Sequence, residues 1–203
     1  MSKKYFITGI STEVGKTIAS AIVTEALEAD YWKPVQAGDL EFSDTHKVQN
    51  LTSNSTSVFH SNAFALNTPM SPHAAAEIDK IQIRLDQIIE PKTQNDLVIE
   101  GAGGLLVPLN DTDTILDIIK PGYKVIVVSR HYLGSINHTL LTVNLLKEKG
   151  FDVAIIFSGD EHPTTEEIIE KMTQVPVLGR INDEPYFDQN VIKEYAAKFK
   201  TVL

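Results

Sequence analysis

The amino-acid sequence predicts an α/β protein with a mostly parallel sheet and helices on both of its faces. Short apolar runs alternate along the chain with segments of helical periodicity. The runs are apolar throughout, which is typical of strands that helices bury on both sides. No internal repeat, low-complexity segment or linker rich in Pro, Gly or Ser interrupts the 203 residues. We therefore expect a single domain over residues 1–203.

The first half of the chain supplies three predicted strands and two predicted helices. Apolar runs predict strands at residues 5–7, 31–35 and 97–99. Apolar residues at helical spacing predict helices at residues 16–29 and 81–89, and Pro91 ends the second one. Residues 36–80 are polar and the least regular. We expect them to form loops on the substrate side of the sheet, with a plain surface excursion as the alternative.

The second half of the chain continues the alternation. Apolar runs predict strands at residues 123–128, 153–157 and 175–178. A helix is predicted at residues 135–149, because two lysines in its last turn and Gly150 after it are typical of a helix end. Thr164 and Glu167 have the spacing of a capping box, which predicts the start of a further helix. The last predicted helix carries one apolar stripe, formed by Ile192, Tyr195, Ala196 and Phe199.

The composition excludes several classes of protein. The chain has no cysteine, so it has no disulfide, no cysteine-ligated metal and no thiol nucleophile. Its 27 acidic residues outnumber 18 basic ones, for a net charge of −9, which argues against a nucleic-acid partner. No apolar run approaches the roughly 18 residues of a membrane helix, and the apolar stretch near the N-terminus is too brief for a signal peptide. We expect a cytoplasmic protein with no membrane partner.

The strongest local signal is a glycine-rich loop between the first predicted strand and the first predicted helix, with the sequence Gly9-Ile10-Ser11-Thr12-Glu13-Val14-Gly15-Lys16-Thr17. It matches a phosphate-binding loop that has five residues, instead of four, before the Gly-Lys-Thr end. Backbone N–H groups and the helix N-terminus bind phosphate oxygens in such loops, and the lysine and threonine serve the phosphates and Mg²⁺. The expected ATP contacts are Thr12, Glu13, Val14, Gly15, Lys16, Thr17 and Ile18. The alternative is a glycine-rich turn with an accidental Lys-Thr pair.

Two carboxylates are candidates for holding Mg²⁺, which prefers oxygen ligands. Glu100 follows the apolar run 97–99, so we expect it at the carboxyl edge of the sheet, where α/β proteins bind ligands. The residues after it, 101–104, allow a ligand to approach the backbone closely. Asp44 lies in a polar stretch after the second predicted strand. The alternatives are a solvated glutamate at a strand end and, for Asp44, a residue in the first turn of a helix.

The segment Lys33-Pro34-Val35 closes the second predicted strand. Burying a lysine there is costly unless an anion faces it. We therefore expect Lys33 to point into the same anionic crevice as the phosphate loop, with a surface lysine as the alternative. Lys16 and Lys33 would then form a local positive pocket in an acidic protein.

With its extra residue, the loop resembles the loops of the P-loop group that contains the nitrogenase iron protein and the MinD/ParA ATPases. Many ATPases of that group carry a second lysine five positions before the loop lysine, where this chain has Ser11. The difference favours a small-molecule enzyme over the alternative, a regulatory ATPase of the MinD/ParA type. An amide-forming ligase of the cobyrinate type would need a glutaminase domain with a catalytic cysteine, which this sequence lacks.

The ordered set of motifs is similar to that of the dethiobiotin synthetase family. The matching segments are 12–17, Lys33-Pro34-Val35 with Gly38, Ser43-Asp44, Pro69 with Ser71-Pro72-His73, 100–104 with Pro108-Leu109, and 133–138 with Leu141-Thr142. The resemblance implies a P-loop fold and an ATP- and Mg²⁺-dependent ligase of biotin biosynthesis. It implies that CO2 and 7,8-diaminopelargonic acid react through a substrate carbamate and a carbamic–phosphoric anhydride to give dethiobiotin, ADP and phosphate.

The resemblance also implies the roles of individual residues. The implied catalytic residues are Lys33 and Lys16, and the implied Mg²⁺ ligands are Thr17, Asp44 and Glu100. Further implied nucleotide contacts are Asp44, Glu100, Gly101, Ala102, Gly103, Gly159 and Asp160. The implied substrate contacts are Lys33, Ala37, Ser71, Pro72, Gly134, Ser135, Ile136 and Asn137. The last four lie at a predicted helix start that, in the family, binds the substrate carboxylate across a homodimer.

Three features differ from the usual family pattern. Ala37 stands where members have Ser or Thr, so a hydroxyl near the carbamate is absent. Gly159 stands where members commonly have an Asn that reads adenine, and glycine has no side-chain donor. The loop after Gly179 also differs. We expect ATP as the co-substrate, and the preference for its base over that of other nucleoside triphosphates stays open.

Overall fold

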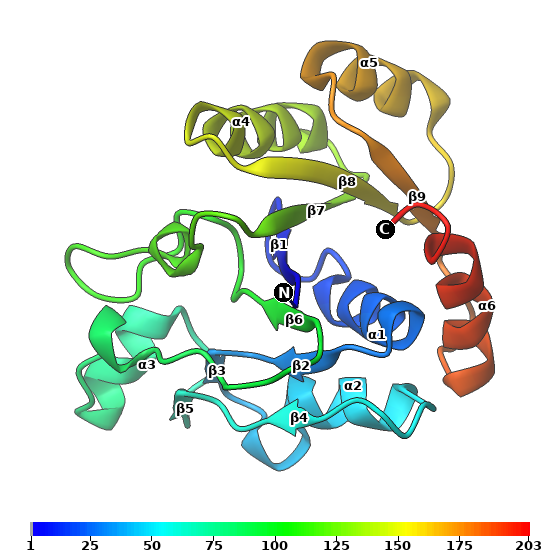
Figure 1. The fold of residues 1–203 in the computed structure, drawn as a ribbon. Coiled ribbons are helices and arrows are strands. Elements are labelled where there is room, and N and C mark those ends of the chain that lie inside the picture. The colour runs from blue at the N-terminus through cyan, green and yellow to red at the C-terminus, as the bar shows by residue number, and fades with distance from the viewer. Residues whose placement is uncertain (1) are drawn as a thin grey trace.

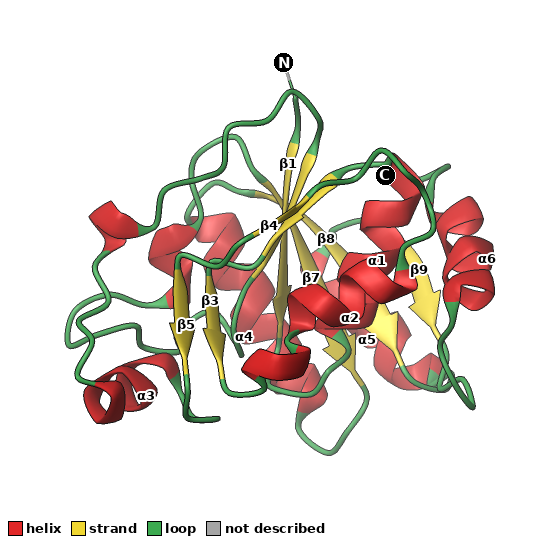
Figure 2. Ribbon diagram, turned by 90° about the horizontal axis from the view of Figure 1, so that it is seen from below, coloured by secondary structure: helices red, strands yellow, loops and turns green. Residues whose placement is uncertain are grey.

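The computed structural model describes residues 2–203 and confirms the predicted α/β fold with parallel strand pairing (Figure 1). Seven strands form the main sheet in the order β4-β2-β6-β1-β7-β8-β9. Their bounds are β1 Lys4–Gly9, β2 Asp30–Trp32, β4 Phe59–His60, β6 Leu97–Glu100, β7 Lys124–Arg130, β8 Asp152–Ser158 and β9 Val177–Ile181. Two further strands, β3 Val35–Ala37 and β5 Phe64–Leu66, pair separately beside the main sheet (Figure 2).

Residues 2–203 form six α-helices, of which five cover the two faces of the main sheet and α3 packs against β3 and β5. Their bounds are α1 Lys16–Leu27, α2 Asp44–Leu51, α3 Pro72–Asp79, α4 Ser135–Glu148, α5 Pro163–Thr173 and α6 Gln189–Phe199. Helices α4 and α5 lie on one face, and α1, α2 and α6 lie on the other (Figure 1). In residues 2–203 no helix has both the length and the apolar character needed to cross a bilayer. The element order and the parallel pairing place the ends of β1, β2, β6, β7, β8 and β9 along one edge of the sheet.

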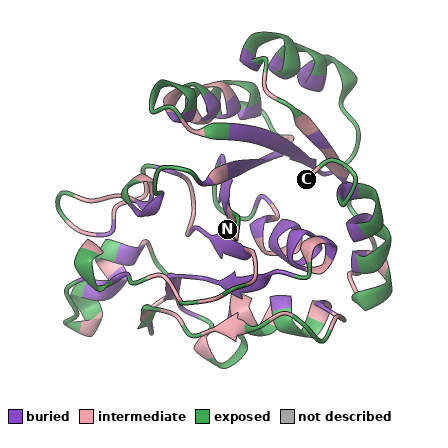
Figure 3. Ribbon diagram, viewed as in Figure 1, coloured by how far each residue is buried: buried purple, intermediate pink, exposed green. Residues whose placement is uncertain are grey.

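The core lies in the centre of this sheet (Figure 3). Strands β1, β7 and β8 are buried along almost their whole length, and their residues are mainly β-branched or aromatic. Such side chains fit a pleated surface that packs on both faces. The apolar stripe of α6 is buried as the periodicity predicts, with Ile192, Tyr195, Ala196 and Phe199 all in the core. The buried centre leaves the carboxyl edge as the place where polar side chains gather.

The structure corrects the predictions for the first half of the chain. The predicted strand 31–35 is two strands in different sheets, because Pro34 has no N–H for a ladder and the chain turns there. The predicted helix at 81–89 is wrong, since a single 3₁₀ turn, Leu85–Gln87, forms in that segment. Ile81 and Ile89 of its apolar pattern are exposed. The helix lies earlier, as α3, and it ends where Lys80 adopts a left-handed conformation.

Two smaller predictions also need correction. Residues 36–80 are more regular than expected, because they contain α2, α3 and three short strands. Thr164 does not cap α5, which begins one residue earlier at Pro163, with His162 as the N-cap residue and no side-chain cap. Proline is favoured at the first position of a helix because its missing N–H would have no partner there.

A buried carboxylate holds together the opposite, amino-terminal edge of the sheet. Asp30 begins β2 and accepts hydrogen bonds from the Val58 N–H at 3.0 Å and from Asn95 Nδ2 at 2.9 Å, while His60 Nε2 lies 2.9 Å from it. Burial raises the pKa of this carboxyl, but these hydrogen bonds outweigh burial and hold the pKa below its ordinary value. Asp30 therefore joins β2, β4 and the segment before β6.

Replacing Asp30 by alanine is expected to lower the free energy of unfolding at pH 7 by about 1–3 kcal/mol, because three polar groups lose their acceptor. The depressed pKa means that the carboxylate stabilises the fold above its unfolded-state pKa of about 4 and loses this effect as the pH falls through its folded-state pKa. Urea unfolding at pH 7 and pH 3 should show the difference between the proteins shrinking in acid. A difference of equal size at both pH values contradicts the role of the charge, and exposed Asp152→Ala at the same edge is the control.

Candidate active site at the phosphate loop

The phosphate loop lies where the sequence predicts it, between β1 and α1. Gly15 precedes α1 with a φ of 94°, a conformation that glycine adopts readily. A Cβ on Gly9 would lie 2.5 Å from Val14 Cγ2 and 3.2 Å from Lys16 Nζ, so the loop closes tightly over the strand end. Lys16 Nζ is nearly buried and donates to the Ser11 carbonyl at 2.9 Å. Burial lowers the pKa of Lys16 to about 8.

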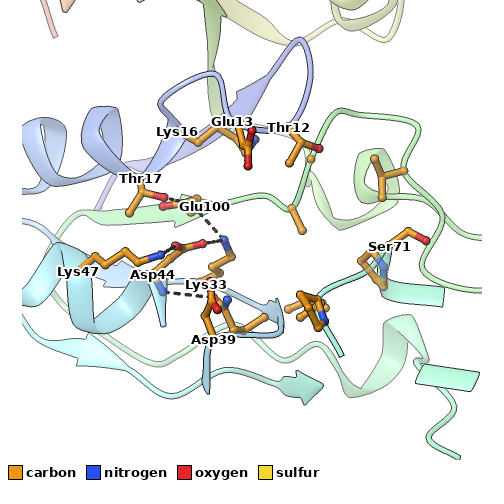
Figure 4. A pocket seen from close by; sticks show the side chains of 18 of the residues that line it. Thr12, Glu13, Lys16, Thr17, Lys33, Asp39, Asp44, Lys47, Ser71 and Glu100 are labelled. Atoms are coloured by element: carbon orange, nitrogen blue, oxygen red, sulfur yellow. Dashed lines mark hydrogen bonds and ion pairs between the residues drawn. The ribbon is translucent and has the colours of Figure 1, made fainter. Parts of the chain in front are cut away.

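A cavity of about 760 Å³ opens beside this loop at the carboxyl edge (Figure 4). It brings together residues that the sequence analysis selected from five separate segments. Those that line it are Thr12, Glu13, Gly15, Lys16, Thr17, Ile18, Lys33, Ala37, Asp44, Ser71, Pro72, Glu100, Ala102 and Gly103. The cavity has the size of a small-molecule site and holds the phosphate loop in one wall.

Lys33 and Glu100 meet because their strands are neighbours. Trp32 of β2 pairs with Ile99 of β6, so Lys33, which follows β2, and Glu100, which ends β6, lie at the same level of the sheet edge. Lys33 Nζ lies 3.2 Å from Glu100 Oε1 and also forms an ion pair with Asp44, the first residue of α2. Burial disfavours the ammonium, but the charges of Glu100 and Asp44 outweigh it and raise the pKa of Lys33. Lys33 is therefore a fixed positive charge at neutral pH and no general base.

Other side chains also form hydrogen bonds with the Glu100 and Asp44 carboxylates. The Thr17 hydroxyl donates to Glu100 Oε1 at 3.0 Å, and the buried Tyr31 hydroxyl donates to Glu100 Oε2 at 2.9 Å. Burial and the charge of Glu100 raise the pKa of Tyr31 well above its ordinary value, so Tyr31 stays a donor. Lys47 Nζ contacts Asp44 Oδ1 at 3.1 Å. Burial raises the pKa of the Asp44 carboxyl, but the contacts with Lys33 and Lys47 outweigh burial and lower that pKa.

The oxygen donors of this cluster suit a magnesium ion. Thr17, Asp44 and Glu100 offer one hydroxyl and two carboxylates around one part of the cavity wall. Within residues 2–203, no group of three His, Cys, Asp or Glu side chains forms a metal site by itself. Mg²⁺ typically uses one or two carboxylates and completes its octahedron with water and phosphate oxygens. The residues present therefore fit Mg²⁺ that arrives with a nucleotide.

Several selected residues lie outside the cavity. Val14 is buried beneath the loop, and a Cβ on Gly101 would contact Phe6 and Ile115. Gly159 and Asp160 lie at the end of β8. The remaining four, Gly134, Ser135, Ile136 and Asn137, form the start of α4, and all but Ser135 are exposed.

Sequence reasoning also missed residues that contact the site. The missed lining residues include Gln36, Asp39, Lys47, Met70 and Val107. The sequence could have indicated Lys47, because this residue lies one helical turn after Asp44 in α2. Gln36 directly follows a selected motif, and its side chain donates to the Gly38 carbonyl at 3.0 Å. The role of Tyr31 depends on β2 lying beside β6, which no local pattern indicates.

Comparison with known proteins now places this site in a family. A family model described as an AAA domain matches residues 3–191. The ATP-dependent dethiobiotin synthetase BioD of Christiangramia forsetii is 66% identical over 201 residues, which cover 98% of this chain and 97% of the relative. This chain belongs to the dethiobiotin synthetase family. The family member from Cytophaga hutchinsonii is 50% identical over 199 residues, covering 97% and 96% of the two chains.

Solved structures of lower identity share the fold of this dethiobiotin synthetase family member. A ParA family ATPase from Chlorobium tepidum aligns with a TM-score of 0.56 and 17% identity, over all of this chain and 91% of its own. The MinD cell division protein of Aquifex aeolicus aligns with a TM-score of 0.58 and 12% identity, over 98% of both chains. These proteins are relatives in fold, while the sequence relatives are ATP-dependent ligases. The regulatory ATPase alternative thus describes the fold class and not the activity.

Proposed function

We propose that this chain closes the ureido ring of dethiobiotin from 7,8-diaminopelargonic acid, CO2 and ATP, with release of ADP and phosphate. The observation that carries the proposal is the position of Lys33. Its ammonium is buried, held by Glu100 and Asp44, and faces the same cavity as Lys16 of the phosphate loop. Two positive charges around one cavity suit a reaction that joins two anions, a carbamate and a triphosphate.

The chemistry follows from these two charges. One substrate amine adds to CO2 and loses a proton, which gives a carbamate anion that the Lys33 ammonium stabilises. A carbamate oxygen attacks the γ-phosphorus, and ADP leaves while Lys16 stabilises the charge on the transferred phosphoryl group. The second amine then attacks the carbonyl carbon of the mixed anhydride, and phosphate leaves as the ring closes. The enzyme supplies position and charge but no nucleophile, which fits a chain without cysteine.

Thr17, Asp44 and Glu100 are the side chains that would hold Mg²⁺, whose charge neutralises the phosphate oxygens. The backbone of the phosphate loop, from Thr12 to Ile18, would bind the phosphates through its N–H groups. Ala37, Ser71 and Pro72 would contact the diamine from the opposite wall of the cavity, which they line together with Lys33.

The proposed reaction is tested by incubating the purified chain with diaminopelargonate, bicarbonate, Mg²⁺ and ATP. Mass spectrometry should detect dethiobiotin, formed in equal amount to ADP. The same reaction without diaminopelargonate should release little ADP, because the carbamate is the phosphoryl acceptor. Absence of dethiobiotin with every nucleoside triphosphate tested would overturn the proposal.

The exposed apolar face beside the loop supports a homodimer. Leu106 and Leu141 are 64% and 62% exposed and line a second hollow of about 430 Å³, together with Ile10 and Thr12 of the phosphate loop. Leu133, two residues before α4, is fully exposed. A second copy that covers this face would place the free N–H groups of one α4 start near the substrate site of the other copy, where they suit a carboxylate. A cytoplasmic location stays a prediction of the sequence.

Replacing Leu141 by lysine is expected to convert the dimer to monomers and to raise KM for diaminopelargonate at least tenfold. The added charge would be buried in an apolar contact in the dimer, which is costly. Sedimentation and steady-state kinetics measure both effects. Ile89→Lys is the matched control, because Ile89 is 75% exposed and does not line this hollow. A monomeric parent protein with full activity would contradict the dimer.

A further inference from the structure

The carboxyl edge of the sheet continues beyond the phosphate loop, on the side opposite to Lys33. In the sheet order, β6 and β2 lie on one side of β1, and β7, β8 and β9 lie on the other. Arg130 ends β7 and is the register partner of Ser158, which ends β8. A Cβ on Gly15 would lie 2.9 Å from Ser158 Oγ, so the end of β8 directly adjoins the phosphate loop.

An arginine–carboxylate pair extends across the end of β8. Arg130 donates to Asp183 through both terminal nitrogens, each at 3.0 Å. The Gly159 N–H bonds to the Ile181 carbonyl, and a Cβ on Gly159 would lie 3.7 Å from Asp183 Oδ2. The two charged side chains are 39% and 51% exposed, so they are open to a ligand. Apart from the neighbours of Gly159 in the chain, no other described atom lies within 4 Å of that Cβ position.

The γ-phosphate and the nucleoside are expected on opposite sides of the phosphate loop. Lys33, Asp44 and Glu100 lie on the β6 and β2 side, where the γ-phosphate must meet the carbamate in the proposed function. The opposite side of the loop, toward β7 and β8, is then the side left for the nucleoside. Resting on that proposed function, we propose that the Arg130–Asp183 pair binds the base, and that Asp183 favours guanine, so that the chain uses GTP alongside ATP.

The chemistry of the pair selects among the bases. Guanine presents two adjacent donors, N1–H and the 2-amino group, which match the two oxygens of a carboxylate in charge-assisted hydrogen bonds. Its O6 and N7 are acceptors that suit an arginine fork. Adenine presents one amino donor beside the acceptor N1, which a carboxylate repels. Guanine binding therefore replaces the contact between Arg130 and Asp183, with Asp183 accepting from N1–H and the 2-amino group and Arg130 donating to O6 and N7. Adenine can replace that contact only in part.

Binding measurements test this independently of the ligase reaction. Isothermal titration of the whole chain with Mg²⁺ complexes of non-hydrolysable ATP, GTP and ITP analogues compares the three bases, and inosine lacks only the 2-amino group. We expect the guanosine analogue to bind at least tenfold more tightly than the inosine analogue and no more weakly than the adenosine analogue. Equal affinity for the guanosine and inosine analogues would overturn the proposal.

The variant Asp183→Asn separates a role in reading the base from a general effect. We expect it to weaken the guanosine analogue at least tenfold and to change the adenosine analogue less than threefold, while Asp183→Ser gives the same pattern if Asn perturbs the fold. The matched control is Asp86→Asn, which breaks an exposed pair of similar geometry with Arg84, outside the active-site cavity. Equal losses for both analogues would overturn the proposal, whereas failure to form dethiobiotin would overturn only the ligase function.

Discussion

Replacing Lys33 by glutamine is expected to lower kcat by roughly 10²- to 10³-fold, the cost of removing one preorganised charge-stabilising group. Affinity for MgATP should change less than about threefold, because Lys16 and the loop backbone bind the phosphates. Glutamine keeps most of the length of the side chain but leaves Asp44 and Glu100 without their shared cation. Single-turnover kinetics and direct nucleotide titration measure the two effects separately.

The control for Lys33 is Lys47→Gln, which removes the same charge from the same cavity and the same carboxylate, Asp44. Lys47 is more exposed than Lys33, so we expect kcat to fall less than about threefold. Loss of the buried partner also costs about 3–5 kcal/mol of stability, so thermal unfolding must show that the Lys33 variant is folded at the assay temperature. A parallel loss of MgATP affinity would contradict the role of Lys33 on the carbamate.

Replacing Glu100 by glutamine is expected to raise the Mg²⁺ concentration for half-maximal activity roughly 10- to 100-fold. The substitution preserves the shape but removes the charge of a fully buried side chain that Thr17, Tyr31 and Lys33 all contact. The kcat at saturating Mg²⁺ should also fall, because the position of Lys33 depends on this carboxylate. A titration of initial rate against Mg²⁺ at fixed ATP measures the change.

The control for Glu100 is Asp39→Asn, because Asp39 is an exposed carboxylate that lines the same cavity. It lies outside the proposed set of metal ligands, so its loss should leave the Mg²⁺ requirement within about twofold. An unchanged Mg²⁺ requirement in the Glu100 variant would show that this carboxylate does not hold the ion.

The parts of the site that the sequence predicted are those with a local signature. The spacing of glycines between a predicted strand and a predicted helix indicates the phosphate loop. An apolar run followed by glycines indicates Glu100. Such patterns indicate a strand end, and the strand ends of a parallel sheet meet at one edge. The sequence therefore predicted that the phosphate loop and Glu100 both belong to the site, but it did not predict the distance between them.

The contacts that the sequence did not predict depend on strand order. Tyr31 donates to Glu100 because β2 lies directly beside β6, and Arg130 reaches Asp183 because β8 lies between β7 and β9. Hydrophobic periodicity carries no information about which strands are neighbours. The false helix at 81–89 has a related cause, since its apolar residues have helical spacing but only part of them, including Ile88, is buried, while Ile81 and Ile89 are exposed.

The proposed role of the carbamate is tested most directly by isotope transfer. The reaction is run with ¹⁸O-labelled CO2, under conditions where exchange with water is slow, and phosphate is analysed by mass spectrometry. Attack of a carbamate oxygen on the γ-phosphorus predicts one ¹⁸O in the released phosphate and one in the carbonyl of dethiobiotin. Unlabelled phosphate beside labelled dethiobiotin would show that the γ-phosphate never joined the carbamate, and would contradict the mechanism built on Lys16 and Lys33.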